Sequence, residues 1–231
     1  MRAVAFAPLQ NRPGTNPRTG VPWADATGAF QPEALRFAKV HGDVRVVLFD
    51  AFAEKSERRS AVREALRAGP SDIECVAFFC HGHKTGLQTG YDGRTGAEQL
   101  AVDLARFSSL HTVVLFACDA GRDGDAASAD DIRPGPGGDG GFADLVRDEL
   151  AQTFARSVTI YAHAATGHTS RLPYVRRFDY ATSAGGEWVI EPDSELWKAW
   201  RRKLQSPKDD FRLTFPFMTQ AELEAALRDK P

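Results

Sequence analysis

The sequence predicts an α/β fold, with a doubly wound, mostly parallel sheet of about six strands flanked by helices. Three observations lead to this prediction. Short apolar runs recur along the chain, helical patterns with recognisable ends lie between them, and the two alternate four times. A strand, a helix and the next parallel strand form one right-handed unit. Repeated alternation therefore indicates one sheet with helices on both faces.

Five apolar runs are the predicted central strands. Each is shorter than a typical helix, and most are rich in Val, Ile or Phe, as buried parallel strands are. They cover residues 3–7, 44–49, 75–80, 112–117 and 158–162. A further strand is expected later in the chain, at 187–190, where a Trp stands among apolar residues.

Four helices are predicted between these strands. The first, over residues 32–41, has Pro in its first turn and Gly42 after its last. Apolar side chains recur at helical spacing in the other three, of which the second covers 57–67 and the fourth 142–150. The third is expected to begin with a capping box, in which Thr95 caps the helix and Glu98 follows three residues later. Each helix is long enough to cross back over the sheet and connect two parallel strands.

Two segments depart from this alternation. Residues 121–141 are rich in Gly, Pro and Asp, so we expect a flexible loop, which is either a site of self-cleavage or a passive connection. Residues 191–231 read as a helical extension: one helix capped by Asp193 or Ser194, and a last one capped by Thr219. We find no linker and expect one domain over the whole chain.

The composition limits which partners and which cellular compartment we expect for the protein. The net charge is −2, so no overall basic field would draw the protein to nucleic acid or to an anionic membrane, and neither partner is expected. An apolar run after Arg2 is halted by Pro8, too early for a secretory signal. Three cysteines without paired spacing make no disulfide framework. A reducing, cytoplasmic location is the expectation.

Two predicted strands lead into residues suited to covalent catalysis. The run 75–80 is followed by His81 and Gly82, and the run 112–117 by Cys118. Active sites of open α/β sheets form beyond the carboxyl ends of the strands, and neighbouring strands lie about 5 Å apart. An imidazole and a thiol placed there can reach the same scissile bond. The pattern predicts Cys118 as nucleophile and His81 as acid/base.

Other interpretations of these residue types stay open. A cysteine at a strand end is often a small buried hydrophobe, which is how we interpret Cys75 and Cys80. His83, His163 and His168 could line the same cleft. A zinc site is disfavoured, because no C-x-x-C or H-x-x-x-H pair places two ligands on one element. We expect neither a metal nor another cofactor.

The motifs, in this order, resemble the caspase-like cysteine peptidases of clan CD, which include caspases, metacaspases and bacterial CHAT-type proteases. An apolar strand ends in His-Gly (FFCHGHKTG), a helix follows, and a second apolar strand ends in Ala-Cys with a Gly shortly after it (LFACDAG). Downstream, VTIYAHAATGHTSR and GEWVI are similar to the family's substrate-lining turn and Trp-bearing strand. The resemblance covers most of residues 3–190 and implies a caspase-like fold.

The resemblance implies a cysteine endopeptidase that cleaves protein or peptide substrates through a thioester, without a cofactor. Carried over to this sequence, His81 is the general acid/base and Cys118 the nucleophile. The backbone N–H groups of Gly82 and Cys118 would bind the oxyanion. This family requires no third carboxylate. The resemblance also allows self-processing and an activating partner protein.

The residues for substrate recognition depart from the family pattern. Caspases have Gln, and metacaspases Asp, two residues before the nucleophile, where each lines the substrate pocket; this chain has Phe116. Arg12 resembles the caspase arginine that binds a substrate Asp, with Arg171 as its second partner and His168 nearby in the sequence. The arginines favour an acidic residue before the scissile bond. Solvated loop arginines are the alternative.

Two binding functions are the alternatives to a peptidase. A caspase-like module without catalytic activity could bind a partner through the same cleft. A flavodoxin-like domain would bind phosphate in a loop after the first strand, for which PLQNRPGTNPRTG is the candidate. Labelling of a reactive thiol separates the peptidase from both.

Overall fold

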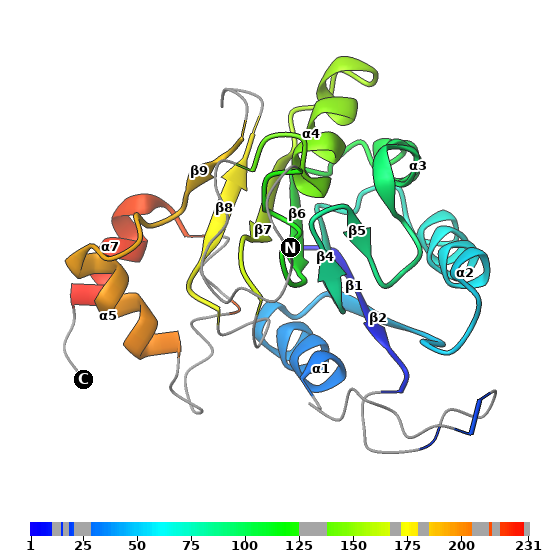
Figure 1. Ribbon diagram of the computed structural model, residues 1–231, viewed down its shortest axis with the longest axis horizontal. Helices are drawn as coiled ribbons and strands as arrows, with labels where there is room; N and C mark the ends of the chain where they lie inside the picture. The colour runs from blue at the N-terminus through cyan, green and yellow to red at the C-terminus, as the bar shows by residue number, and fades with distance from the viewer. Residues whose placement is uncertain are drawn as a thin grey trace.

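The computed structural model describes residues 1–10, 15, 19–20, 29–124, 138–166, 172–179, 185–204, 213 and 218–228. It has an α/β fold built on a mostly parallel seven-stranded sheet, in the order β2-β1-β3-β6-β7-β8-β9 (Figure 1). The parallel strands are β1 (Ala3–Pro8), β2 (Val44–Phe49), β3 (Cys75–Phe79), β6 (Thr112–Phe116) and β7 (Thr159–His163). The five predicted central strands are thus confirmed.

The sheet is one strand wider than predicted. β8 (Val175–Phe178) pairs antiparallel with β7, and β9 (Glu187–Trp188) pairs antiparallel with β8. β8 has the sequence VRRF, so two arginines hide its strand character from a search for apolar runs. The Arg176 guanidinium stacks 3.8 Å from the centre of the Trp188 ring, which lets a charged side chain sit on an almost fully buried strand.

Helices cover both faces of the sheet, as predicted. The helices are α1 (Phe30–His41), α2 (Lys55–Arg67), α3 (Gly93–Ala105) and α4 (Phe142–Gln152). Side chains alternate between the two faces along each strand, so each strand contributes to two cores. On one face the small residues Ala3, Ala5 and Ala7 let α1 approach closely, with Phe37 filling the space between them. The larger side chains of the other face pack against α2, α3 and α4.

The predicted start of the third helix was wrong. α3 begins at Gly93, two residues before Thr95, and its N-cap is Asp92. The preceding hairpin sets this start, because the Gly93 N–H donates to the Thr85 carbonyl at 2.7 Å. Tertiary hydrogen bonding therefore overrides the local capping signal.

The C-terminal extension forms two helices, α5 (Glu195–Leu204) and α7 (Gln220–Arg228), which lie together beside the β8–β9 edge (Figure 1). Of the two predicted caps for α5, Ser194 is the one used: its Oγ accepts the Trp197 N–H at 3.1 Å. The predicted capping box of α7 forms between Thr219 and Glu222. Trp197 and other apolar residues of both helices pack in a separate core against β8.

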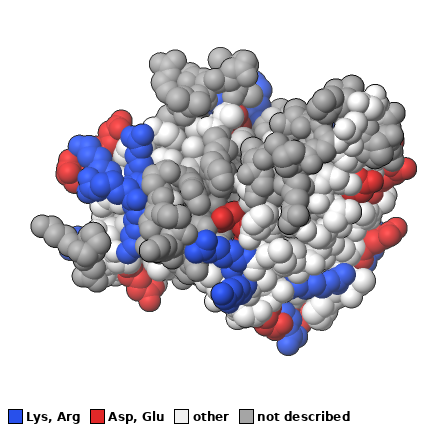
Figure 2. All heavy atoms as spheres, turned by 90° about the horizontal axis from the view of Figure 1, so that it is seen from below, with Lys and Arg blue, Asp and Glu red and all other residues white. Residues whose placement is uncertain are grey.

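Basic side chains are concentrated at the end of α5. Figure 2 shows Lys and Arg gathered on the side of the molecule where α5 lies. Arg201, Arg202 and Lys203 occupy its last turn, where cations complement the negative end of the helix dipole. Arg201 also lies over the Trp197 ring, 5.5 Å from its centre.

Across the described part of the chain, no helix combines the length and apolar character needed to cross a bilayer.

Candidate functional site

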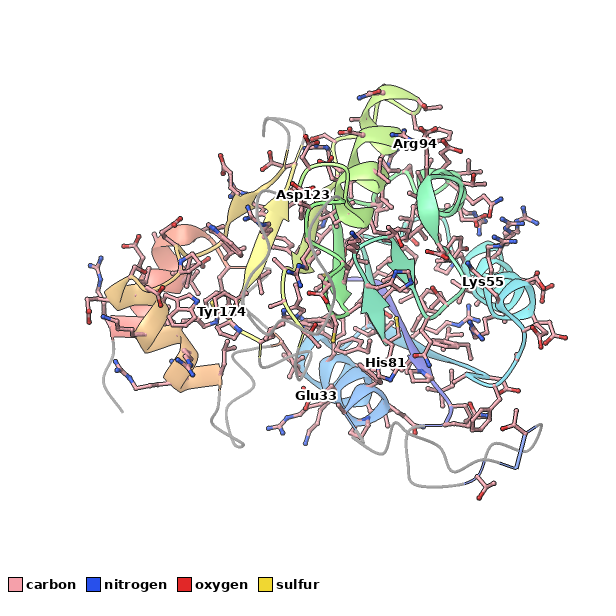
Figure 3. All side chains as sticks on the ribbon, viewed as in Figure 1. Glu33, Lys55, His81, Arg94, Asp123 and Tyr174 are labelled. Atoms are coloured by element: carbon pink, nitrogen blue, oxygen red, sulfur yellow. The ribbon has the colours of Figure 1, made fainter. Side chains whose placement is uncertain are left out.

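His81 and Cys118 follow neighbouring strands that end at the same edge of the sheet. β3 and β6 are paired in parallel, with Phe79 opposite Phe116. His81 and Cys118 each come two residues after this last pair, so the register brings their main chains together. His81 lies beside α1 (Figure 3). Its ring meets the ring of Phe30 on α1 edge-on, with 4.9 Å between ring centres.

Gly82 brings the two loops into direct contact. A methyl group at this position would lie 2.7 Å from the Ala117 Cβ and 2.8 Å from the Cys118 carbonyl oxygen. Both distances are well inside van der Waals contact, so only glycine fits here without movement of the main chain. The peptide that follows His81 is therefore packed on the peptide that carries Cys118.

The main chain of His81 is fixed by Gln88. The His81 N–H donates to the Gln88 Oε1 at 3.2 Å, and the Gln88 N–H donates to the His81 carbonyl at 2.9 Å. The intervening residues form a short hairpin, with β4 (Gly82–His83) antiparallel to β5 (Gly86–Leu87). The hairpin carries His81 as a rigid unit, because it is bonded at both of its ends.

The residue after Cys118 has an unusual backbone conformation. Asp119 has φ of 56°, the left-handed region, and is 1% exposed. Such a conformation costs on the order of 1–3 kcal/mol, which contacts with the surrounding residues must offset. Here the carboxylate pairs with Arg122 at 3.3 Å and accepts the Thr166 hydroxyl at 2.8 Å. These contacts hold a sharp turn that begins at Cys118.

The two described ends of the 121–141 segment lie against each other. The Gly124 N–H donates to the Asp139 carbonyl at 2.9 Å, and a methyl group at Gly141 would lie 1.8 Å from the Arg122 carbonyl oxygen. Residues 122–124 and 139–141 are therefore in contact, and this contact lies only a few residues after Cys118 in the chain. Residues 125–137, on which the predicted flexibility of this loop depends, lie outside the described residues.

His83 belongs to a different surface cluster. Its Nδ1 lies 2.9 Å from the Thr85 Oγ1, and its Nε2 lies 3.7 Å from the Asp92 Oδ1. Lys55 forms an ion pair with the same carboxylate. These polar neighbours hold His83 at the start of α3 and leave His81 as the histidine beside α1.

The residues predicted for substrate binding are only partly described. Phe116 is 1% exposed, and its ring stacks on Phe79 with 4.5 Å between centres. It supports the strand ends from within the core. Arg12, Arg171 and His168 lie outside the described residues, so their roles stay predictions.

The buried thiols and the described titratable residues offer no metal site. Cys75 and Cys80 are fully buried, as expected, and burial raises the pKa of Cys80 to about 12. That value makes Cys80 a poor ligand or nucleophile at neutral pH. Within the described ranges, no group of three His, Cys, Asp or Glu side chains is placed to hold a metal ion.

His163 is a buried histidine at the end of β7, which pairs with β6, the strand that precedes Cys118. It is 2% exposed, and its Nδ1 makes no hydrogen bond to any described residue. Burial lowers the pKa of His163 to about 3, from an ordinary value of 6.5. The imidazole is therefore neutral in the folded protein throughout the physiological range.

His163 should make the protein lose stability as the pH falls below about 6. Between the two pKa values the unfolded chain binds a proton that the folded chain excludes, so the free energy of unfolding drops by up to about 1.4 kcal/mol per pH unit. His163→Phe should reduce this slope in denaturant titrations at several pH values. His111→Gln, which changes an exposed histidine, is the control. Equal slopes in the wild type and His163→Phe would contradict the assignment.

Three residues near the site were not singled out from the sequence. Gln88 and Asp119 act through the backbone contacts described above. The third is Glu33, one helical turn after Phe30 on α1, which is 7% exposed and lies on the helix that contacts His81 (Figure 3). Only Asp119 carries a sequence signal, because Asp tolerates the left-handed region better than most residues.

Comparison with models of known protein families finds none that matches the chain. Comparison with curated proteins also finds no match. The function is therefore inferred from the site and from the order of its motifs.

Proposed function

We propose that this protein is a caspase-like cysteine endopeptidase in which Cys118 is the nucleophile and His81 the general acid/base. One observation carries the proposal. Gly82, directly after His81, is packed on the Ala117–Cys118 peptide so closely that a single methyl group would not fit. The order of the motifs, His-Gly and then Ala-Cys on the next strand of the sheet, supports the same assignment.

The proposed reaction has two halves. The Cys118 sulfur bonds to the substrate carbonyl carbon, the thiol proton passes to His81, and the carbonyl electrons move onto oxygen. The tetrahedral intermediate collapses to a thioester while His81 protonates the departing amine. Water then attacks the thioester with His81 as base, which releases the acid product and restores the thiol.

Backbone N–H groups would stabilise the charge that develops on the oxygen. By resemblance to the family these donors are Gly82 and Cys118, whose peptides lie in contact. The Asp119 N–H is directed elsewhere, because it donates to the Ala165 carbonyl at 3.3 Å. A third catalytic carboxylate is not needed, and self-cleavage within residues 121–141 stays a prediction.

A thiol-reactive peptide probe tests the proposal directly. We expect covalent labelling at Cys118, located by mass spectrometry, that is lost or strongly slowed in His81→Ala. Cys75 and Cys80 serve as internal controls, because burial raises the pKa of both thiols and should keep them unlabelled in the folded protein. A probe that labels neither Cys118 nor any other residue would favour a binding module.

Substrate choice is a separate prediction. If Arg12 and Arg171 bind the side chain before the scissile bond, Asp-ended fluorogenic peptides should be cleaved faster than Arg-ended ones. The comparison uses kcat/KM for the two peptides in the wild type and in Arg12→Ala, which should lose Asp cleavage selectively. Faster cleavage of the Arg-ended peptide would contradict this assignment and leave the catalytic pair untouched.

One observation favours the flavodoxin-like alternative. The parallel strands run in the order β2-β1-β3-β6-β7, which is the order of flavodoxin-like binding domains. Their ligands bind where the strand order reverses, between β1 and β3. Most of the loop after β1 lies outside the described residues. Tight nucleotide or flavin binding together with an inert Cys118 would select this alternative.

A further inference from the structure

β2 forms an open edge of the sheet. It pairs with β1, and no strand lies on its other side among the described residues (Figure 1). The opposite edge, β9, has only two residues, one of them Glu187. Short and charged edge strands are a common way to prevent pairing with other chains. β2 lacks this protection: it is six residues long, with the sequence VRVVLF.

Alternate residues of β2 direct their backbone groups away from β1. The Phe49 carbonyl accepts the Leu9 N–H at 2.8 Å, so Phe49 and the other odd-numbered residues of the strand face β1. Successive residues of a strand point their N–H and C=O groups in opposite directions. Val44, Val46 and Leu48 therefore face outward. The Val44 N–H already donates to the Gly42 carbonyl at 2.8 Å, so the edge offers the N–H groups of Val46 and Leu48 and the carbonyls of all three residues.

The side chains of β2 are mostly apolar and would not prevent pairing with another strand. Leu48 is 38% exposed, and the outward-facing residues Val44 and Val46 are partly exposed. Arg45 is the one charged residue of the strand, and its Nη1 lies 3.4 Å from the Ala65 carbonyl of its own α2. The exposed Arg45 side chain thus extends toward the molecule's own helix, and the other five residues of the strand are apolar.

We propose that β2 pairs with β2 of a second copy of this chain, antiparallel about a two-fold axis at Val46. This axis places Val46 of one copy opposite Val46 of the other, and the N–H of each donates to the carbonyl of the other. It also places Val44 opposite Leu48, so that each Leu48 N–H meets a Val44 carbonyl. The six residues are self-complementary in this register. For this reason the edge suits a second copy better than an unrelated strand.

The size of the edge sets the expected affinity. Six residues span about 20 Å, and three layers of helix, sheet and helix are about 30 Å high. The contact is then about 600 Å² on each copy, or about 1,200 Å² in total, the lower end for specific complexes. We therefore expect a reversible dimer with a Kd in the micromolar range rather than an obligate one.

Sedimentation equilibrium on the full chain, from well below to well above this Kd, tests the proposal. Val46→Pro removes an outward N–H without removing a bond to β1, and an edge strand tolerates proline at such a position. Leu48→Lys places a charge on the edge and keeps the backbone intact. Each variant should weaken association at least tenfold. Val102→Lys, an equally apolar exposed site on α3 that is 54% exposed, is the matched control and should dimerise normally.

A wild-type chain that stays monomeric at every concentration would overturn the proposal, as would a dimer that neither edge variant weakens. Circular dichroism checks that Val46→Pro is folded; if it is not, Leu48→Lys decides alone. Cys118→Ala should dimerise like the wild type, because the edge lies apart from the catalytic pair. The outcome is thus independent of whether the protein is a peptidase.

Discussion

Replacement of either Cys118 or His81 by Ala is expected to lower kcat/KM for peptide cleavage by at least about 10⁴-fold, because each removes one half of the proposed catalytic pair. Without the thiol no thioester forms, and without the imidazole neither the thiol nor the leaving amine exchanges its proton. Both residues follow strand ends rather than filling the packed interior, so the fold should survive. Cleavage of a fluorogenic peptide library, with circular dichroism on each variant, measures both effects.

His83→Ala is the matched control for the histidine assignment. His83 lies two residues further along the same hairpin, but its contacts are with Thr85 and Asp92. This variant should keep most of its activity. If His83→Ala is inactive and His81→Ala is active, His83 and not His81 is the acid/base. Full activity in Cys118→Ala would contradict the proposed mechanism.

Gly82→Ala is expected to cost on the order of 10²-fold in kcat/KM with a much smaller effect on folding. The added methyl group would lie 2.7 Å from the Ala117 Cβ, so the two loops must separate. This movement would displace His81 from Cys118 and shift a proposed oxyanion donor, and a misplacement of about 1 Å can cost this much in rate. Steady-state kinetics and thermal unfolding of the same preparation separate the two effects.

Gly69→Ala is the control for this substitution. A methyl group there meets its nearest neighbour, the Leu66 carbonyl oxygen, at 3.3 Å, far from the candidate site. Activity should remain close to that of the wild type. If Gly82→Ala keeps full activity, the close approach of the two loops has no role in catalysis, and the proposed oxyanion donors must be found elsewhere.

The alternation of apolar runs and helical stripes determined the parallel part of the fold. Buried strands such as β3 and β6 need apolar residues on both faces, so the signal of the runs 75–80 and 112–117 is continuous and strong. The same two runs also predict that His81 and Cys118 each follow the end of a strand. This information is local, because it depends on what each segment must bury.

The tertiary structure decided what depends on residues distant in sequence. β8 is a strand because β7 and Trp188 accommodate its arginines, and α3 starts at Gly93 because Thr85 accepts its N–H. The neighbouring placement of β3 and β6, which brings Gly82 onto Cys118, is a property of strand order, and no segment encodes strand order alone. The same holds for the left-handed turn at Asp119, whose partners include a residue 47 positions away. Such contacts become favourable only once the sheet has formed, so local patterns predicted the elements and packing arranged the site.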